Sequence, residues 1–179
     1  MKLLRTIRLD PSDTFVFERA AEPGEWAVSG AFAFAHLDVA ELEGKVRAAF
    51  RSGLLGIDSL GWSTLVQIVE ASEDDRVAAV ELLARRLVER FGAPDLAAAR
   101  PAAEEEIAFA AVLSDHPKGM LAAVSRKYEN GAIREAFRTL TPAVGPKPLR
   151  AYAFLEVAGE DDAPAEDVDL LTLGQGERR

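Results

Sequence analysis

Few residues of this sequence are of a type that could do chemistry. His36 and His116 are the only histidines, and cysteine is absent. The lack of cysteine excludes disulfides, thiolate metal sites and cysteine nucleophiles. His116 directly follows Asp115, and the pair could act as a base with its orienting carboxylate. Adjacent side chains rarely point at each other, however, and a histidine at the end of a helix is also what the helix dipole favours.

A small-molecule pocket is one interpretation of the remaining candidates. His36 lies between a predicted strand and a predicted helix cap, and Trp62 ends the glycine-punctuated stretch "SGLLGIDSLGW" at 52–62. That stretch matches neither G-x-G-x-x-G nor the P-loop and holds no lysine for a phosphate, so an ordinary connector is the simpler reading. The alternative is a pocket lined by His36, Trp62 and His116.

No metal, cofactor or serine nucleophile is predicted. Two histidines with scattered acids reproduce no metal-ligand spacing such as H-E-x-x-H. Ser29, in "VSGAF", lacks the first glycine of G-x-S-x-G and lies within a predicted strand. The run Glu104, Glu105 and Glu106 is explained by the dipole of a helix that starts just before it, so these side chains are expected to be solvated.

The stretch "SRKYENGAIREAF" at 125–137 is the least ordinary feature. Its Asn130-Gly131 step favours a two-residue type I′ turn between antiparallel strands. That turn pairs Tyr128 with Ile133, Arg126 with Glu135, and Val124 with Phe137. The alternative is a helix-turn-helix, because the hydrophobic residues after the turn also fit helical spacing.

The opposite face of this hairpin carries Lys127, Arg134 and Arg138. Lys127 would face Arg134, a like-charge pair that mildly destabilises a sheet. We predict that these three cations bind an anion or an acidic partner. The alternative is that they are solvated, or neutralised by the acidic segment at 160–169.

Charge is unevenly distributed along the chain. The net charge is −9 over 179 residues. Residues 160–169 hold six acids and no base, whereas 118–150 hold seven bases and two acids. General nucleic-acid binding is disfavoured, since it needs a broad positive surface.

Arg5 and Arg8 interrupt any signal-peptide run, and no stretch approaches the ~20 apolar residues of a membrane span. We therefore expect a cytoplasmic protein with neither a nucleic-acid nor a membrane partner.

Periodicity and capping residues predict the following elements. Strands are expected at 2–9, 14–19, 25–35 and 62–71, helices at 39–51, 73–91 and 101–114, then the hairpin and a last strand at 149–158. Asp38 and Ser72 are the expected N-caps of the first two helices, and Pro101 is the expected first residue of the third. The connection at 54–61 is expected to be a loop.

This order, β-β-β-α-β-α-α-β-β-β, lacks the regular βαβα alternation of a doubly wound sheet. It predicts an α+β fold, with a mostly antiparallel sheet and about three helices packed on one side. We expect one compact domain at 1–158 and a flexible acidic tail at 159–179.

With "EEEIAFAAVLSDHPKGMLAAVSRKYENGAIREAFRTL", the sequence resembles short proteins of GC-rich bacteria that form a family of unknown function. The resemblance extends over most of the chain up to the tail. It implies a housekeeping or accessory role in the cytoplasm, and no activity or catalytic residue is carried over from it.

Three functional hypotheses follow. The first is a non-catalytic accessory or protein-interaction module that uses the basic hairpin. The second is a small-molecule enzyme or binding protein with a pocket near His36 and Trp62. The third, self-association through edge strands of the sheet, is compatible with either.

Overall fold

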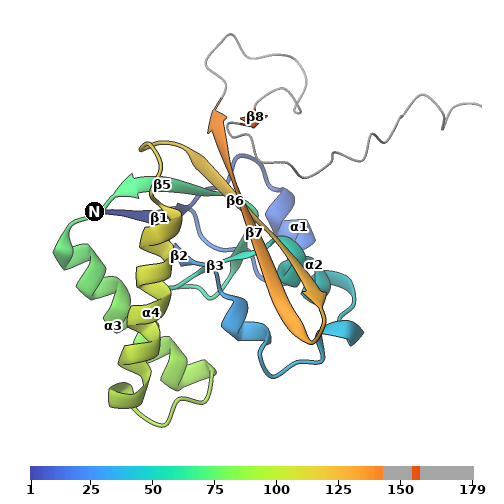
Figure 1. Cartoon of the computed structure of the whole chain (residues 1–179), viewed down its shortest axis with the longest axis vertical. Helices are drawn as coiled ribbons and strands as arrows, with labels where there is room; N and C mark the ends of the chain where they lie inside the picture. The colour runs from blue at the N-terminus through green and yellow to red at the C-terminus, as the bar shows by residue number, and fades with distance from the viewer. Residues whose placement is uncertain (143–154, 158–179) are drawn as a thin grey trace, which may run out of the picture.

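The protein folds around one curled antiparallel sheet (Figure 1). The structure is a computed structural model, and it describes residues 1–142 and 155–157. Eight strands of these residues are ordered β4-β3-β2-β1-β5-β6-β7-β8, and every neighbouring pair is antiparallel. Their bounds are Lys2–Thr6 (β1), Trp26–Val28 (β2), Leu54–Gly56 (β3), Trp62–Ser63 (β4), Val66–Glu70 (β5), Leu121–Glu129 (β6), Ala132–Pro142 (β7) and Leu155–Val157 (β8). The predicted α+β class with a mostly antiparallel sheet is confirmed.

The described chain contains four α-helices, which pack against the sheet or against one another. They are Ser12–Val16 (α1), Gly44–Ser52 (α2), Glu73–Arg90 (α3) and Leu96–Leu113 (α4), with 3-10 turns at Ala31–Phe34 (η1) and Val39–Glu41 (η2). In Figure 1, α3 and α4 lie side by side, and α4 packs against β1 and β2. The shorter α2 packs against β6 at the other end of the molecule. None of the described helices is long and apolar enough to cross a bilayer.

The core explains why β1 is central. Leu3 and Leu4 point to opposite faces of the sheet, yet both are buried. The main cluster joins them to Val66 and Ile68 of β5 and to inward-facing residues of α3 and α4. A second cluster, around Phe17, Phe34 and Phe50, fills the space beneath α2.

The first forty residues depart most from the predicted pattern. The strand expected at 14–19 is the short helix α1, and the strand expected at 25–35 ends at Val28. Tertiary contacts override β-propensity here: the buried Asp13 carboxylate accepts hydrogen bonds from the backbone N–H and hydroxyl of Thr64 (3.1 and 2.5 Å). Gly30, at φ +78°, then turns the chain from β2 into η1.

Helix starts were predicted less well than helix ends. Asp38 caps the 3-10 turn η2, and α2 begins later, at Gly44, while Gly53 ends it as predicted. The Ser72 cap of α3 is confirmed, with a reciprocal capping box to Asp75. Pro101 is not the first residue of its helix. Asp95 caps α4, accepting from the Ala98 N–H at 2.8 Å, so Pro101 lies inside the helix.

Two connections were predicted incompletely. The loop expected at 54–61 contains β3, and the strand expected at 62–71 is divided into β4 and β5. The last strand, expected at 149–158, falls partly outside the described residues, and its described part, Leu155–Val157, pairs with β7. The tail predicted at 159–179 lies outside the described residues.

The hairpin of β6 and β7 is confirmed in every predicted pair. Tyr128 lies opposite Ile133, Arg126 opposite Glu135, and Val124 opposite Phe137. Asn130 and Gly131 both have positive φ, as a type I′ turn requires. The alternative, a helix-turn-helix, is wrong.

Two glycines permit a test of how tightly the start of η1 is packed. Gly30 and Gly92 have nearly the same φ (+78° and +79°), but a Cβ at Gly30 would lie 2.5 Å from the Leu55 Cβ, whereas one at Gly92 would meet nothing within 4 Å. We expect Gly92→Ala to lower the free energy of unfolding by about 1–2 kcal/mol through backbone strain alone. Gly30→Ala should lower the free energy of unfolding by about 1–3 kcal/mol more than Gly92→Ala does, because the added methyl group overpacks the site. Urea unfolding followed by circular dichroism measures both, and equal losses would contradict the close packing.

Candidate functional site

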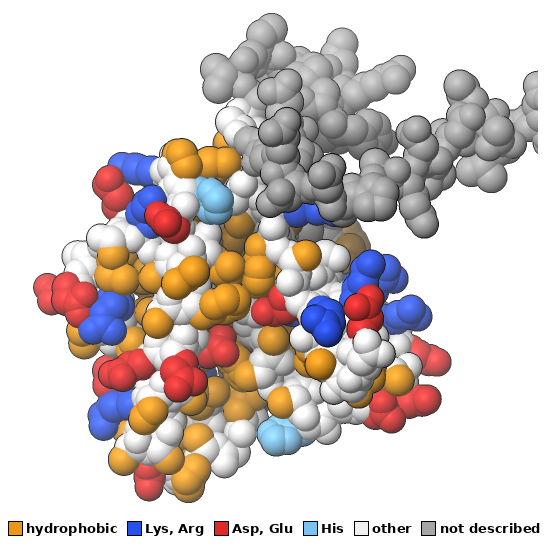
Figure 2. Space-filling model, in the orientation of Figure 1, with side chains coloured by type: hydrophobic (Ala, Val, Ile, Leu, Met, Phe, Trp, Pro, Cys, Tyr) orange, Lys and Arg blue, Asp and Glu red, His pale blue; other side chains and the backbone are white. Residues whose placement is uncertain are grey.

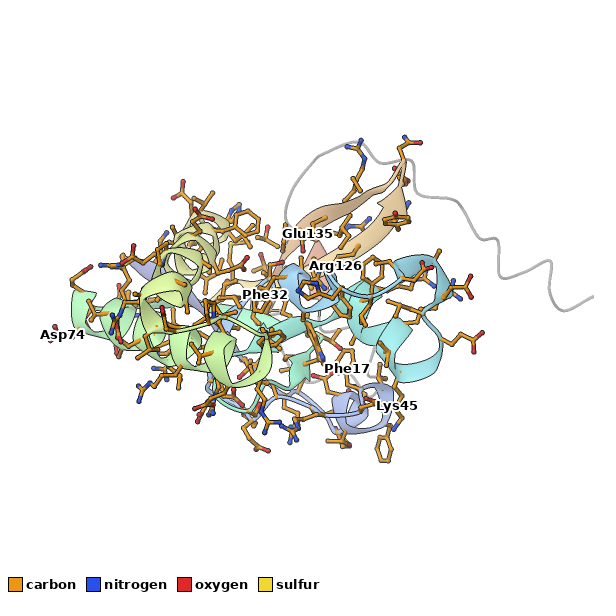
Figure 3. The ribbon with its side chains drawn as sticks, turned by 90° about the horizontal axis from the view of Figure 1, so that it is seen from below. Phe17, Phe32, Lys45, Asp74, Arg126 and Glu135 are labelled. Atoms are coloured by element: carbon orange, nitrogen blue, oxygen red, sulfur yellow. The ribbon has the colours of Figure 1, made fainter. Side chains whose placement is uncertain are left out.

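The two faces of the β6–β7 hairpin have different surroundings, and both bear on function. In Figure 3 the hairpin projects from the body of the molecule, with Arg126 and Glu135 close together where it meets the helices and the rest of the sheet. We call the face that carries Arg126 the inner face, and the face that carries Lys127, Arg134 and Arg138 the outer face. Figure 2 shows basic side chains gathered on the side of the molecule where the hairpin and α2 lie.

The outer face brings the three predicted cations together. Lys127 lies directly opposite Arg134, and Arg138 follows on the same face of β7. All three residues are exposed. Among the described residues, the only ion pair on this face is a loose one from the Arg134 Nε to the Glu129 carboxylate at 3.8 Å, between side chains that are 66% and 52% exposed. The described residues therefore leave most of this positive charge unneutralised.

The inner face is dominated by the buried Arg126, which is only 2% exposed. Its Nη1 donates to the backbone carbonyls of Gly53 (2.6 Å) and Phe50 (3.1 Å), and its Nη2 donates to the carbonyl of Ser29. Its Nε donates to the Glu135 carboxylate at 2.6 Å. The last carbonyls of a helix lack partners within the helix and carry its negative dipole end, so this guanidinium caps α2.

Ser29 completes the surroundings of Glu135. The Ser29 hydroxyl donates to the same Glu135 Oε1 that accepts from Arg126, at 2.5 Å. Ser29 follows directly after β2, so this contact joins the end of β2 to β7. Because Arg126 also reaches the end of α2, one ion pair connects four segments of the chain.

Glu106 of α4 lies near this ion pair and has no hydrogen-bond partner of its own among the described residues. Its Oε2 is buried without a hydrogen bond in the described structure. Burial, with the negative charge of Glu135 and against the attraction of Arg126, raises the pKa of Glu106 to about 7. We call Arg126, Glu135, Ser29 and Glu106 the buried charge cluster. Its net charge is zero when Glu106 is protonated and −1 when Glu106 is ionised.

The chemistry open to this cluster is limited. The Arg126 donors already bind protein oxygens, so the guanidinium is not available to a substrate. The Ser29 hydroxyl is bound to a carboxylate and has no histidine beside it among its hydrogen-bond partners. No group of three or more His, Cys, Asp or Glu residues in the described chain could hold a metal ion. What the geometry supports is a rigid joint that fixes the hairpin to the body of the protein.

The residues of the predicted small-molecule pocket lie in different surroundings. His36 is exposed between η1 and η2, and His116 is exposed after α4, where its backbone carbonyl accepts from the Lys2 ammonium at 2.6 Å. Trp62 stacks on Phe34 with ring centroids 5.1 Å apart. In the sheet, β2 and β3 separate the strand of Trp62 from that of Lys2. Two surface pockets of the described chain are lined by other residues, and a ligand at these three side chains stays a prediction.

Sequence reasoning missed the buried charge cluster for two reasons. It paired Arg126 with Glu135 correctly, but nothing near Arg126 in the sequence indicates that α2 would cover it. It also placed the start of α4 too late, so that Glu106 was assigned to a solvated first turn. Once α4 is extended, Glu106 lies three residues after Ala103 and four before Ala110, on the buried stripe of the helix. That spacing was the available signal.

A protein-family model described as "Family of unknown function (DUF6505)" matches residues 1–153, and the chain therefore belongs to this family. The matched range includes both hairpin faces and the whole buried charge cluster. No curated protein and no solved structure matches the chain.

The joint can be tested by removing its cation. We expect Arg126→Met to lower the free energy of unfolding by about 3–5 kcal/mol, because Glu135 would be left without its cation and the α2 carbonyls without their cap. The double variant Arg126→Met/Glu135→Gln should recover part of this loss, since no unpaired carboxylate remains. Urea unfolding of both variants and of the parent chain measures this. A loss below about 1 kcal/mol in the single variant would contradict the joint.

The raised pKa of Glu106 predicts a pH dependence of stability. A carboxyl whose pKa rises from an ordinary 4.5 to about 7 on folding favours the folded state fully below pH 4.5, and this advantage is lost as pH rises through 7. Glu106→Gln cannot ionise. We expect it to be more stable than the parent by about 1–2 kcal/mol at pH 8, a value reduced from the full shift for solvent screening, and by little at pH 5.

Thermal and urea unfolding at the two pH values measure the effect of Glu106→Gln. Glu104→Gln, an exposed change on the same helix, is the matched control and should show little difference between pH 5 and pH 8. The same response in both variants would contradict the role of burial at Glu106.

Proposed function

We propose that this member of the family is a non-catalytic, cytoplasmic protein-interaction module that binds an acidic segment of a partner on the outer face of its hairpin. The observation that carries the proposal is the register of β6 and β7, which sets Lys127 opposite Arg134 with Arg138 on the same face. The contact residues are these three cations.

The arrangement is unfavourable for the fold by itself. Like charges that face each other across a strand pair destabilise it by a few tenths of a kcal/mol or more. Only Glu129, at 3.8 Å from Arg134, reduces the repulsion within the described residues. Carboxylates of a partner would remove it, and arginine can bind them through two parallel hydrogen bonds. Binding would therefore relieve a repulsion that the isolated chain retains.

The inner face makes the outer face a suitable binding surface. Arg126 and Glu135 fix the two strands to α2 and to the end of β2. A surface that is held rigid before binding loses less conformational entropy when it binds. Beyond the joint, near the turn, Tyr128 is 48% exposed. Tyr128 lies on the inner face, opposite Ile133, so the outer contact surface consists of the three cations without it.

Self-association through the sheet edge has less support. The edge strand β4 has only two residues, Trp62–Ser63, and short edge strands limit pairing between chains. The positive outer face would also repel a second copy of itself. The chain as a whole is acidic, with a net charge of −9, so attraction of an acidic partner depends on this local surface rather than on the overall charge.

Affinity capture from a lysate of the native cells tests the proposal, with the intact chain as bait. We expect a stoichiometric partner with an acidic contact segment, whose affinity falls at least tenfold for Arg134→Glu/Arg138→Glu and weakens with added salt. The control is Arg85→Glu/Arg90→Glu, which makes the same change of charge at exposed positions of α3. It should keep the partner, and circular dichroism should show both variants folded.

Three results would overturn the proposal. A partner that binds the Arg134→Glu/Arg138→Glu variant as tightly as the parent would place the contact elsewhere. Equal losses in this variant and in the α3 control would indicate a general charge effect. The absence of any partner would remove the interaction role and shift attention to small-molecule binding.

A further inference from the structure

A surface pocket away from the hairpin residues is lined by three arginines. It has a volume of about 390 Å³ and lies between the segment that follows α1, the β3–β4 turn and the end of α3. Its charged lining residues are Arg19, Glu22, Asp58, Arg86 and Arg90. It shares no residue with the hairpin surface or with the buried charge cluster.

The backbone that forms this pocket is firmly held. Gly61 packs so closely on the segment after α1 that a Cβ there would lie 2.4 Å from the Ala20 carbonyl oxygen. The Trp62 N–H donates to the Arg19 carbonyl at 2.9 Å. The Glu25 carboxylate accepts from the backbone N–H groups of Asp58 and Ser59 at 3.0 and 2.9 Å. A ligand would therefore meet a wall that is already in place.

The three guanidinium groups differ in how far they are already bound. Arg86 forms ion pairs with Asp58 (3.0 Å) and Glu89 (2.9 Å), while its Nε is buried without a partner in the described structure. Within the described residues, Arg19 has one side-chain hydrogen bond, from its Nη1 to the Ser59 carbonyl at 2.9 Å. Arg90 has no side-chain hydrogen bond or ion pair within the described residues. Arg19 and Arg90 thus keep donors for a ligand.

The charge balance favours an anion. Arg86 is already neutralised by Asp58 and Glu89, so the charged lining groups left without an ion pair in the described structure are Arg19 and Arg90, against the single carboxylate of Glu22. Glu22 is the only lining carboxylate without a cation within hydrogen-bonding distance in the described structure, and it is exposed. Guanidinium groups bind the oxygens of phosphate and carboxylate through parallel N–H donors. The volume is that of a site for a small molecule rather than for a protein segment.

We infer that this pocket binds a small molecule through its oxyanion group, a phosphate or a carboxylate, with Arg19 and Arg90 as the direct ligands. Arg86, held by its two ion pairs, fixes the pocket wall between them. The inference is independent of the interaction proposed for the hairpin, because neither surface requires the other.

Isothermal titration calorimetry of the full chain with inorganic phosphate, and separately with malonate, tests this at constant ionic strength. We expect saturable binding of at least one of them, weakened at least tenfold in Arg19→Ala and in Arg90→Ala. Both side chains are exposed, so these variants should fold. Arg85→Ala, an exposed change on α3 outside the pocket, should bind like the parent. Stronger binding of phosphate would indicate a phosphorylated ligand, and stronger binding of malonate a carboxylate.

The absence of saturable binding of either anion would overturn the inference. Binding that is equal in the parent, Arg19→Ala and Arg90→Ala would also overturn it, because the anion would then lie elsewhere on the protein. Arg19→Ala and Arg90→Ala should leave capture of the hairpin partner unchanged, so that failure of this inference and failure of the proposed function are distinguishable.

Discussion

The guanidinium of Arg126 is buried where the end of α2, the residue after β2 and both strands of the hairpin meet. A cation out of water is costly unless its donors find acceptors, and here they find the Glu135 carboxylate and three backbone carbonyls from two segments, the end of α2 and the residue after β2. Each of those segments must therefore hold its place for the cation to be tolerated. The position of the hairpin, the end of α2 and the turn at Gly30 all depend on this one side chain.

Glu106 makes the charge of the same region depend on pH. The Arg126–Glu135 pair is neutral, so a second carboxylate on α4 has no cation left to neutralise it. Its buried, unpartnered oxygen and raised pKa are consequences of that imbalance. Near neutral pH, Glu106 is therefore close to half ionised at the contact between α4 and the hairpin.

Successive side chains of a β-strand point to opposite faces, so in the hairpin the residues that hold the fold and those proposed to bind a partner lie on different faces. Arg126 and Lys127 are neighbours in sequence, yet one is buried against α2 and the other is exposed. The buried residue finds its counter-charge within the protein, whereas the exposed cations are left largely without one in the described chain. The arginine pocket near the end of α3 follows a comparable pattern, in which Arg86 is paired and Arg90 has no ion pair within the part of the chain that the structure describes.

Local chemistry in the sequence determined several parts of this protein. The Asn130-Gly131 turn set the hairpin register to the residue, because a two-residue turn allows one pairing, and the Ser72 cap set the start of α3. Tertiary structure decided what local pattern could not: α1 in place of a strand, the early start of α4, and the burial of Arg126 and Glu106. A strand pattern specifies which side chains share a face, but not which face another element will cover. For Arg126 that depended on α2, more than seventy residues earlier in the chain, because burial is a property of packing between distant segments.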